Sequence, residues 1–492
     1  MQIKWYVAAR AVKWGLSAGL RAGISRSLAQ FWTGHYGETG EKGTTIAMSD
    51  RTLDVEDIQG DILGGFNTDI QEFLGFAIAG PDGAGKVATW LATLAPQVSS
   101  VAQVSRERDA MKAVPASPEL TWLAIAISHT LLKSAAPDVT ILDEAFSAGM
   151  AARAASALAD RSSPSSWVVG ASGKPIDVLL KVAANSEGAV RTKADALAIA
   201  AAANGLALTY RETGRRLNNN AEHFGFRDGI SQPDVVGYQS AVGLMPGYFL
   251  FGYPTVAGGI PPQWAIDSRN VTDNGSLVVF RRLVQDVVAF ENFCAAQANA
   301  LRGQWPGLRG EQLAALIVGR WPSGAPAHPD VPADPGVAGD PDNSFNFLGD
   351  LEGATCPFGA HIRKVNPRKG PGDFVDIPRL LRRGIPFGPT VADDPEAERG
   401  LFFVAYQASI VRGFEFISGQ WMNSHDRPSG HSGDDMLVGR PFDSRSVPIK
   451  HGTVAITVSN SQAQQWIRPT GGAYLFAPSK AGLRRLADSV AN

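Results

Sequence analysis

The sequence has only two cysteines, Cys294 and Cys356, among its 492 residues. Two cysteines can build neither the disulfide framework of a small secreted protein nor a cysteine-rich zinc site. They could form a single disulfide only if the fold brings them together, and the sequence leaves this open.

Long apolar runs and a strong net charge are also absent. No stretch of about 18 uninterrupted apolar residues occurs, which excludes an ordinary membrane span. The formal net charge of −2 gives no reason to expect a nucleic-acid partner. Hydrophobic and charged fractions of 44% and 19% are typical of a soluble globular protein, and the chain length suggests about two to three domains.

Three common catalytic signatures are missing or incomplete. The histidines include no i, i+4 pair and no HExxH, which argues against a zinc protease. No GxSxG elbow accompanies Ser231, so the sequence does not indicate a serine hydrolase. Residues 80–86 match the spacing of a phosphate-binding loop, but Val87 stands where that motif needs a hydroxyl for magnesium. We interpret this stretch as a turn that leads into a helix.

What the sequence does contain is a histidine within a basic stretch, residues 356–368, which read CPFGAHIRKVNPR. His361 follows a Gly-Ala step that allows close approach of the backbone, and a neutral imidazole is a good iron ligand. Arg363, Lys364 and Arg368 would suit the carboxylates at the edge of a haem. Because a loop histidine is more often a surface or capping residue, this stretch alone makes only a candidate site.

A second stretch, residues 224–234, reads FGFRDGISQPD and holds one carboxylate, Asp228, in a loop marked by glycine and proline. With these two stretches the chain resembles the dye-decolourising (DyP-type) haem peroxidases, whose shared marks are a GxxDG loop, here residues 225–229, and a later histidine that binds the haem iron. Further matches are DIQGDILGGF at 57–66, LLRRGIPFGP at 380–389 and RGLFFVAYQASI at 399–410. The resemblance covers residues 53–487.

This resemblance implies a peroxidase that reduces hydrogen peroxide through a high-valent iron-oxo intermediate and oxidises dyes, phenolics or other bulky aromatic reductants. It implies one haem b per chain, with the iron bound axially by His361. In the family the Asp of GxxDG moves a proton on the open face of the haem, and an arginine of the RRGIPFG stretch stabilises the developing charge. The carry-over places Asp228 and Arg382 in these roles, with Arg383 as the adjacent alternative.

The resemblance also implies the surroundings of the haem. Leu401 and Phe403 match apolar positions that line the open face in relatives and would keep it dry. An iron-bound imidazole normally donates its second N–H to a carboxylate, and Asp435 in DDMLVGR stands at the matching position, with Asp434 as the substitute.

Arg363, Lys364 and Arg368 are the candidates for the haem propionates. Large dyes cannot enter a pocket shaped for peroxide, so electrons could travel from surface aromatics, and Trp421 lies at the corresponding family position. The two other aromatic residues to test are Tyr406 and Trp466.

Hydrophobic periodicity predicts alternating strands and helices after residue 54. We expect strands at residues 73–79, 120–128, 167–182, 206–211, 276–283, 401–407, 453–458 and 472–476, and helices at 84–94, 145–158, 188–203, 284–300 and from about 479. Residues 322–343 form a loop too long to be a plain connection. This alternation fits an α+β protein. The resemblance implies two ferredoxin-like domains, each an antiparallel β-sheet with packed helices, with the haem between or beside them.

We place the domain boundary near Gln239, which gives domains at residues 49–239 and 240–492. Residues 1–48 differ from both, because five basic residues precede the first acidic one, Glu38. An export or targeting leader, a membrane-surface helix and an extension upstream of a true start at Met48 are the three interpretations. The apolar run is interrupted and no twin-arginine pair is present, so we favour a dispensable extension of a cytoplasmic protein, with export as the alternative.

Two other functions are compatible with parts of the sequence. A non-catalytic haem-binding module for storage, delivery or sensing would need His361 but not Asp228 and Arg382. A structural or partner-binding protein that has lost haem would need none of the three. The presence of all three residues favours the peroxidase, whose partners would be hydrogen peroxide and a reducing substrate, and the chain could form a homo-oligomer.

Overall fold

The computed structural model describes residues 51–488, with gaps at 81–82, 114–118, 340, 369–377, 428–431, 440–444 and 461–463. Residues 49–492 form one unit by themselves. The predicted basic extension at residues 1–48 lies outside the described residues. None of the helices in the described ranges is long and apolar enough to cross a membrane.

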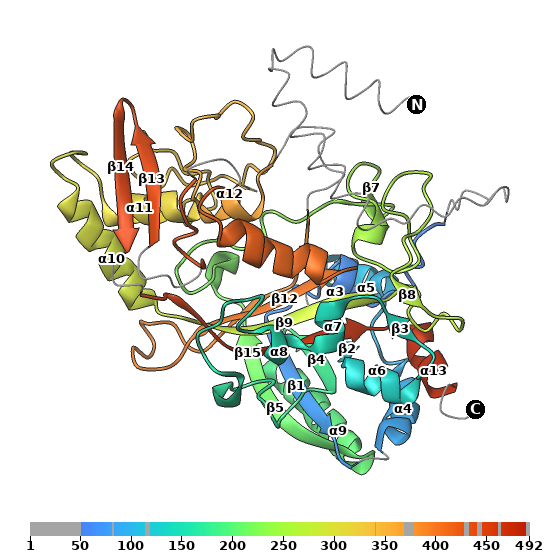
Figure 1. Cartoon of the computed structure of the whole chain (residues 1–492). Helices are drawn as coiled ribbons and strands as arrows, with labels where there is room; N and C mark the ends of the chain where they lie inside the picture. The colour runs from blue at the N-terminus through green and yellow to red at the C-terminus, as the bar shows by residue number, and fades with distance from the viewer. Residues whose placement is uncertain are drawn as a thin grey trace. The chain divides into compact units, whose positions relative to one another are not determined.

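The central feature is a sheet of nine strands, all antiparallel to their neighbours, that closes on itself as a barrel (Figure 1). The strands are β1 (Ile70–Ile78), β2 (Trp122–Ile127), β4 (Val178–Ala184), β5 (Leu206–Arg215), β9 (Ser276–Gln285), β10 (Leu381–Arg382), β11 (Ile385–Phe387), β12 (Gly400–Gln407) and β15 (Ile467–Ala477). Their order is β10-β12-β11-β5-β1-β4-β2-β15-β9. Strand β9 also pairs with β12, and this pairing closes the ring.

Each half of the barrel has the strand order of a ferredoxin-like fold. The N-terminal half is arranged as β5-β1-β4-β2 and the C-terminal half as β15-β9-β12-β11. Numbered along the chain, both halves run fourth, first, third, second, which is the order that two split βαβ units produce. The predicted α+β fold with two ferredoxin-like antiparallel sheets is therefore confirmed. The boundary near Gln239 falls between the two sets of strands and stays a prediction.

The two halves meet at two narrow seams. One backbone pair joins β11 to β5 at Phe387 and Gly214, and another joins β15 to β2 at Phe476 and Ile127. At the first seam a Cβ on residue 214 would lie 2.5 Å from Cγ2 of Ile385. Glycine at this position therefore permits the close approach of strands that completes the barrel.

Side chains alternate between the interior and the outer face of the barrel. The interior is filled with aromatic rings: Phe402 is fully buried, and its ring centroid lies 4.9 Å from Phe73 and 4.7 Å from Phe387. Burying one such ring stabilises the fold by about 1.5–3 kcal/mol. Helices cover the outer face of the N-terminal half. These and the neighbouring helices are α3 (Gly60–Leu63), α4 (Gly83–Leu94), α5 (Val101–Ala113), α6 (His129–Ala135), α7 (Glu144–Ala148), α8 (Met150–Arg153), α9 (Glu187–Ala203) and α13 (Lys480–Asp488).

A second group of elements lies over the outer face of the C-terminal half, above β9 and β12 in Figure 1. Part of this layer has its own core around the buried Trp321 and Trp466. This layer lies over the outer face of β9 and β12, and the two together enclose a cavity. Its elements are α10 (Val287–Ala300), α11 (Gly310–Val318), α12 (His361–Val365), π-helical turns at Val411–Glu415 and Ile417–Met422, and the hairpin of β13 (Arg445–His451) and β14 (Val454–Asn460). Short strand pairs are β3 (Thr140–Ile141) with β8 (Ala265–Ile266) and β6 (Val235–Val236) with β7 (Gln239–Ser240).

Most predicted elements are present, with two corrections. The helix expected at 84–94 is α4, so the glycine-rich stretch before it does lead into a helix. The strand expected at 167–182 is wrong before Val178, where β4 begins, because the preceding residues form turns. The helix expected at 145–158 is divided into α7 and α8 at Gly149, whose φ of +78° lies in the left-handed region. The long loop at 322–343 is confirmed, since its described residues contain no helix or strand.

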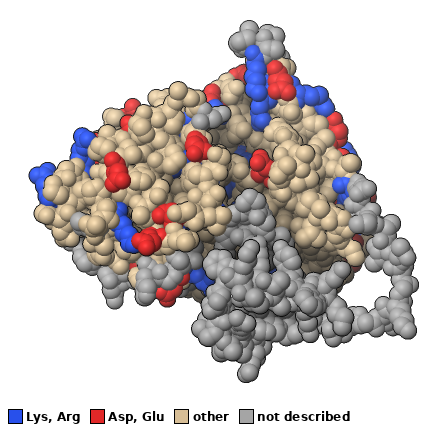
Figure 2. All heavy atoms as spheres, turned by 90° about the horizontal axis from the view of Figure 1, so that it is seen from above, with Lys and Arg blue, Asp and Glu red and all other residues tan. Residues whose placement is uncertain are grey.

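The face seen in Figure 2 carries charges of both signs. Lys and Arg side chains lie among Asp and Glu side chains over its described part, and most of the area between them is uncharged. Opposite charges that alternate over such short distances largely cancel beyond a Debye length. This face therefore gives little long-range attraction to an approaching molecule of either sign.

Candidate active site

A cavity of about 770 Å³ lies between the outer face of the barrel and the layer above it. Strands β9, β10 and β12 contribute its floor, and α12 and the π-helical turn Ile417–Met422 contribute its roof. Loop residues 226–234 and 343–346 also line it. The volume falls in the range of about 300–1,000 Å³ that is usual for cofactor and ligand pockets.

The strand register gives this cavity an apolar floor. Leu401 and Phe403 lie on the outer face of β12 and pair with Leu283 and Arg281 of β9, and all four line the cavity. Phe402, between them, points into the barrel. An apolar wall keeps water out and strengthens electrostatic interactions inside the site.

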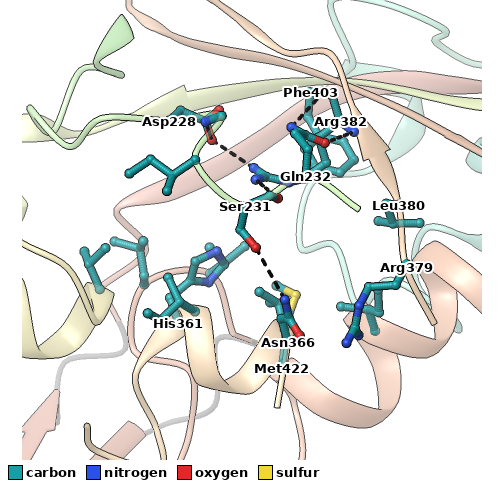
Figure 3. A pocket seen from close by; sticks show the side chains of 18 of the residues that line it. Asp228, Ser231, Gln232, His361, Asn366, Arg379, Leu380, Arg382, Phe403 and Met422 are labelled. Atoms are coloured by element: carbon teal, nitrogen blue, oxygen red, sulfur yellow. Dashed lines mark hydrogen bonds and ion pairs between the residues drawn. The ribbon is translucent and has the colours of Figure 1, made fainter. Parts of the chain in front are cut away.

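Asp228 and Arg382 meet at the wall of this cavity (Figure 3). Arg382 Nη1 donates to Asp228 Oδ1 at 2.9 Å, and each side chain is about a third exposed, at 33% and 34%. Arg382 Nη2 also donates to the carbonyl of Ser231 at 3.1 Å. The Gly229 amide donates to Asp228 Oδ1 at 2.6 Å, and the positive φ of Gly229 forms the turn that makes this possible.

These contacts keep Asp228 ionised. Burial raises the pKa of Asp228, but the charge of Arg382 and the hydrogen bond from Gly229 outweigh burial, so its pKa lies below the ordinary value of 3.8. The alternative arginine, Arg383, points elsewhere: it donates to the carbonyls of Asp61, Ile62 and Leu63 at the end of α3. Arg382 is therefore the arginine of this pair that reaches the cavity.

His361 is the first residue of α12 and lines the cavity on the side opposite the Asp228–Arg382 pair (Figure 3). Its Nδ1 lies 2.8 Å from Oδ2 of Asp435, which is completely buried. Burial raises the pKa of Asp435, but the imidazole of His361 and the backbone amide of Val438 lower it more, and the net pKa is below its usual value. An ionised Asp435 accepts Nδ1–H, which leaves Nε2 as the atom with a free lone pair. The substitute, Asp434, instead accepts the amide of Ser446.

Two of the three cations expected at the haem edge do not reach the cavity. Arg363 is buried and donates to Asp350 Oδ2 at 2.6 Å, with its guanidinium over the rings of Phe347 and Phe358. Lys364 donates to the carbonyls of residues 424, 427 and 433, and burial lowers its pKa to about 8. Both charges are used to hold the loops around α12. The structure thus argues against Arg363 and Lys364 as propionate partners.

The third cation, Arg368, does line the cavity, and a further one accompanies it. Arg368 lies 4.1 Å from the centre of the Phe345 ring and donates to the carbonyl of Asn343 at 2.7 Å. Arg379 also lines the cavity, and its hydrogen-bond partner is the carbonyl of its neighbour Pro378. Within the described chain neither arginine forms an ion pair with a carboxylate. The sequence motifs do not indicate Arg379, although it immediately precedes the matching LLRRGIPFGP stretch.

The three aromatic residues proposed as electron donors are in different surroundings. Trp421 is half-buried in the π-helical turn, stacks edge-on against Phe416 at 5.5 Å and precedes Met422, which lines the cavity. Tyr406 is only 4% exposed inside the barrel, and Trp466 is completely buried. Neither Tyr406 nor Trp466 is a surface residue, so their proposed role as surface donors is wrong.

The two cysteines do not form a disulfide. Both are buried, Cys294 in α10 and Cys356 in the loop before α12. Burial raises the pKa of the Cys356 thiol to about 12, so it stays protonated at neutral pH. Neither cysteine lines the cavity, whereas His361 does, so His361 is the candidate metal ligand there.

The residues around the cavity fit a haem. An imidazole with a carboxylate on its far nitrogen stands on one wall, apolar residues and an Asp–Arg pair stand on the other, and two arginines without carboxylate partners lie along the lining. Haem needs these three features: an axial nitrogen, a largely apolar slot and cations for its propionates. The lining of this cavity is therefore compatible with a bound haem.

Comparison with known proteins identifies the family of both halves of the chain. Residues 57–214 match the family model of the DyP dimeric alpha+beta barrel domain, and residues 260–431 match that of the C-terminal domain of Dyp-type peroxidases. Dye-decolorizing peroxidase msp1 of Mycetinis scorodonius is 32% identical over 480 residues, which cover 89% of this chain and 88% of the relative. Dye-decolorizing peroxidase AauDyP1 of Auricularia auricula-judae is 32% identical over 465 residues, 87% of this chain and 86% of the relative.

Solved structures give the same result. An ancestral D-type dye decolorizing peroxidase superposes with a TM-score of 0.73 at 29% identity, over 88% of this chain and 99% of that one. The fungal DyP-type peroxidase from Auricularia auricula-judae gives 0.72 at 29% identity, over 89% and 100%. The chain therefore belongs to the dye-decolourising peroxidases, a family of haem enzymes. It is a peroxidase, and nothing in the comparisons favours a non-catalytic haem module.

Proposed function

We propose that the chain binds one haem b in this cavity with His361 as the axial ligand, and that Asp228 and Arg382 act on hydrogen peroxide at the opposite face. The observation that carries this proposal is the placement of His361 and the Asp228–Arg382 pair on opposite walls of one cavity. The haem, when bound, supplies the redox chemistry, receiving two oxidising equivalents from peroxide and passing them to reductants.

His361 owes its suitability as a ligand to Asp435. The 2.8 Å contact to Nδ1 fixes the tautomer in which Nε2 is unprotonated. Asp435 is itself held by the amides of Leu437 and Val438, at 3.0 and 3.1 Å, so the imidazole cannot turn freely. A carboxylate in this position makes the imidazole more electron-rich, which favours the oxidised states of a bound iron.

Asp228 and Arg382 would perform the proton transfer and the charge stabilisation of peroxide cleavage. Ionised Asp228 accepts a proton from one peroxide oxygen and returns it to the other as the O–O bond breaks and water leaves. The guanidinium of Arg382 stabilises the negative charge that develops on the departing oxygen. The apolar side chains of Leu401 and Phe403 exclude bulk water and strengthen this interaction.

Arg368 and Arg379 are the residues that we assign to the haem propionates. Both line the cavity and neither has a carboxylate partner in the described chain. Burial lowers the pKa of Arg379 to about 10, so its guanidinium is still charged at neutral pH. Two guanidiniums match two carboxylates in charge, and they can bind them through pairs of hydrogen bonds.

The reducing substrates would be dyes, which the names of the relatives indicate for those proteins, and also phenolics or other bulky aromatic compounds. We infer that such compounds are oxidised at the surface near Trp421. This side chain is partly exposed, and the next residue in the chain, Met422, lines the cavity. Electrons would then cross only a short distance of protein.

An absorption spectrum of the purified protein, before and after one equivalent of hydrogen peroxide, tests the proposed function. We expect a Soret band that shifts and loses intensity on addition of peroxide and returns when a phenol is added. If protein supplied with excess haem and then purified shows no Soret band, the proposed haem site is refuted. A Soret band that does not respond to peroxide would refute the peroxidase mechanism while leaving haem binding intact.

A further inference from the structure

A second carboxylate, Glu222, lines the cavity beside the loop that carries Asp228. It belongs to none of the stretches that carry the catalytic assignment. Its Oε2 accepts the amide of Phe224 and its Oε1 accepts the amide of Phe226, both at 3.0 Å. Oε2 also accepts the side-chain amide of Gln285. One side chain thus collects three donors from a short loop and a barrel strand.

The three donors explain the shape of the loop. The amide of Glu222 donates to the carbonyl of Phe226 at 3.0 Å, and the amide of Gly225 donates to the carbonyl of Glu222 at 2.8 Å. Gly225 has a φ of +90°, which only glycine adopts without strain. Asp228 follows two residues after this closed turn. The direction of its side chain is therefore set where the turn ends.

The loop is also tied to the barrel. Gln285 is the last residue of β9, and its backbone amide donates to the backbone carbonyl of Arg399 at 2.9 Å. Arg382 stands on β10 of the same barrel. The contact between Glu222 and Gln285 consequently fixes the Asp228 loop relative to the strands that present Arg382. From the other side, the rings of Phe224 and Phe226 are buried, and Phe224 packs on Phe290 at 4.9 Å.

We propose that Glu222 is a positioning residue for Asp228: it holds the loop of residues 222–228 against β9 so that the Asp228 carboxylate faces Arg382 and the peroxide. The inference rests on the role of Asp228 proposed above. Glu222 acts through the loop backbone and takes no proton from the substrate. Its contribution should therefore disappear when Asp228 can no longer act as a base.

The protonation behaviour of the group is compatible with this role. The pKa of Glu222 is raised to about 7, because burial and, to a smaller extent, the charge of Asp228 outweigh the hydrogen bonds from Phe224, Gln285 and Phe226. No described residue donates to Oε1 of Gln285. If the Gln285 side-chain amide turned by half a rotation, its oxygen would accept a hydrogen bond from the O–H of a neutral Glu222, so the contact with β9 can persist in both protonation states.

A double-mutant cycle on the haem-loaded protein tests the proposal. The variants are Glu222→Gln, Asp228→Asn and the double variant, and the matched control is Glu311→Gln, since Glu311 is exposed at the start of α11. Gln is isosteric with Glu but presents one amide group where the loop needs an acceptor. We expect Glu222→Gln to lower the second-order rate with peroxide roughly tenfold, to leave the KM for the dye unchanged, and to cost less than twofold in the Asp228→Asn background.

A second measurement does not depend on catalysis. Hydrogen exchange of the peptide spanning residues 222–228 should be roughly tenfold faster in Glu222→Gln than in wild type and in the Glu311→Gln control. If Glu222→Gln fails to fold, Gln285→Met removes one donor and should give the same changes at about a third of the size.

The outcomes separate this inference from the proposed function. If Glu222→Gln lowers the peroxide rate by the same factor in the wild-type and Asp228→Asn backgrounds, the positioning role is overturned. Unchanged hydrogen exchange of the loop amides would overturn it too. A wild-type peroxide rate in Asp228→Asn would overturn the proposed function, and the inference with it. A slow Asp228→Asn combined with a non-additive cycle and faster exchange supports both.

Discussion

Arg382 Nη1 lies 2.9 Å from Asp228 Oδ1, although 154 residues separate the two in the chain. The contact joins the loop after β5, in the N-terminal half of the barrel, to the short strand β10 in the C-terminal half. The base and the cation proposed for peroxide cleavage therefore come from different halves. Only closure of the barrel brings them together, which links the fold directly to the chemistry.

This pairing predicts a pH dependence. Asp228 is ionised above its lowered pKa, so the peroxide reaction should keep its rate in acidic solution and fall only below pH 3.8, the ordinary pKa of this carboxyl group. In Arg382→Leu the charge that lowers the pKa is lost while burial remains, so the acidic limb should move to higher pH. The plateau rate should also fall by about 10²–10³. Stopped-flow rates across the pH range measure both effects.

Arg302→Leu is a matched control, because Arg302 is exposed and does not line the cavity. It should leave the profile unchanged. An acidic limb at the same pH in Arg382→Leu and wild type would show that Arg382 does not set the ionisation of Asp228.

His361→Ala should abolish tight haem binding, since no other described histidine lines the cavity. The apoprotein should take up haem with a weak, displaced Soret band, and added imidazole should restore much of the normal spectrum by filling the vacated space. Asp228→Ala and Arg382→Ala serve as controls that keep haem but react slowly with peroxide. Normal haem retention and activity in His361→Ala would exclude His361 as the ligand.

The positions of the other basic residues show what the sequence could and could not predict. The motif stretches singled out Asp228, Arg382 and His361, and all three line one cavity; their roles stay predictions. The directions of the Arg363 and Lys364 side chains depend on the short helix α12. A helix of five residues is too short to show a hydrophobic periodicity in the sequence. At about 100° per residue, these two residues leave the face of His361, whereas Val365 returns to it.

Long-range contacts decided the remaining details. Apolar, strand-like patterns predicted most barrel strands, and β2 and β4 are buried on both faces. These patterns did not predict that two sheets share a ring whose seams are single residue pairs. The burial of Tyr406 and Trp466 likewise depends on partners far away in the chain. The Asp61 carboxylate that accepts the Tyr406 hydroxyl is 345 residues distant.

The His361–Asp435 contact predicts a change in reduction potential. Asp435→Asn removes the carboxylate that makes the imidazole electron-rich, so the ferric state should be less stabilised and the Fe(III)/Fe(II) potential should rise. The rate with peroxide should fall by about 10–100-fold while haem stays bound. Spectroelectrochemical titration measures the potential. Asp434→Asn is the control, because Asp434 accepts the Ser446 amide and does not touch His361.

Arg379 provides a test of the cofactor's edge. Arg379→Leu removes a cation that has no carboxylate partner in the described chain, so the apoprotein itself should lose little stability. Haem affinity should fall roughly tenfold or more, since a charge-assisted hydrogen bond contributes about 1.5–3 kcal/mol. Titration of apoprotein with haem gives the affinity, and Arg302→Leu is again the control. Equal affinities in Arg379→Leu and wild type would remove Arg379 from the propionate assignment.

Trp421 separates reactions at the surface from those in the cavity. In the wild type the ring centroids of Trp421 and Phe416 are 5.5 Å apart. Trp421→Phe keeps an aromatic ring at this place, but a phenyl ring is much harder to oxidise than an indole. We expect kcat for a bulky dye to fall at least roughly tenfold, while the peroxide rate, which depends on Asp228 and Arg382, stays within about twofold of wild type. Steady-state kinetics with one large and one small reductant, beside stopped-flow peroxide rates, measure the three quantities. Unchanged turnover of the large dye would place its oxidation elsewhere on the protein, whereas a parallel loss for the small reductant would indicate that the substitution disturbs the cavity through Met422.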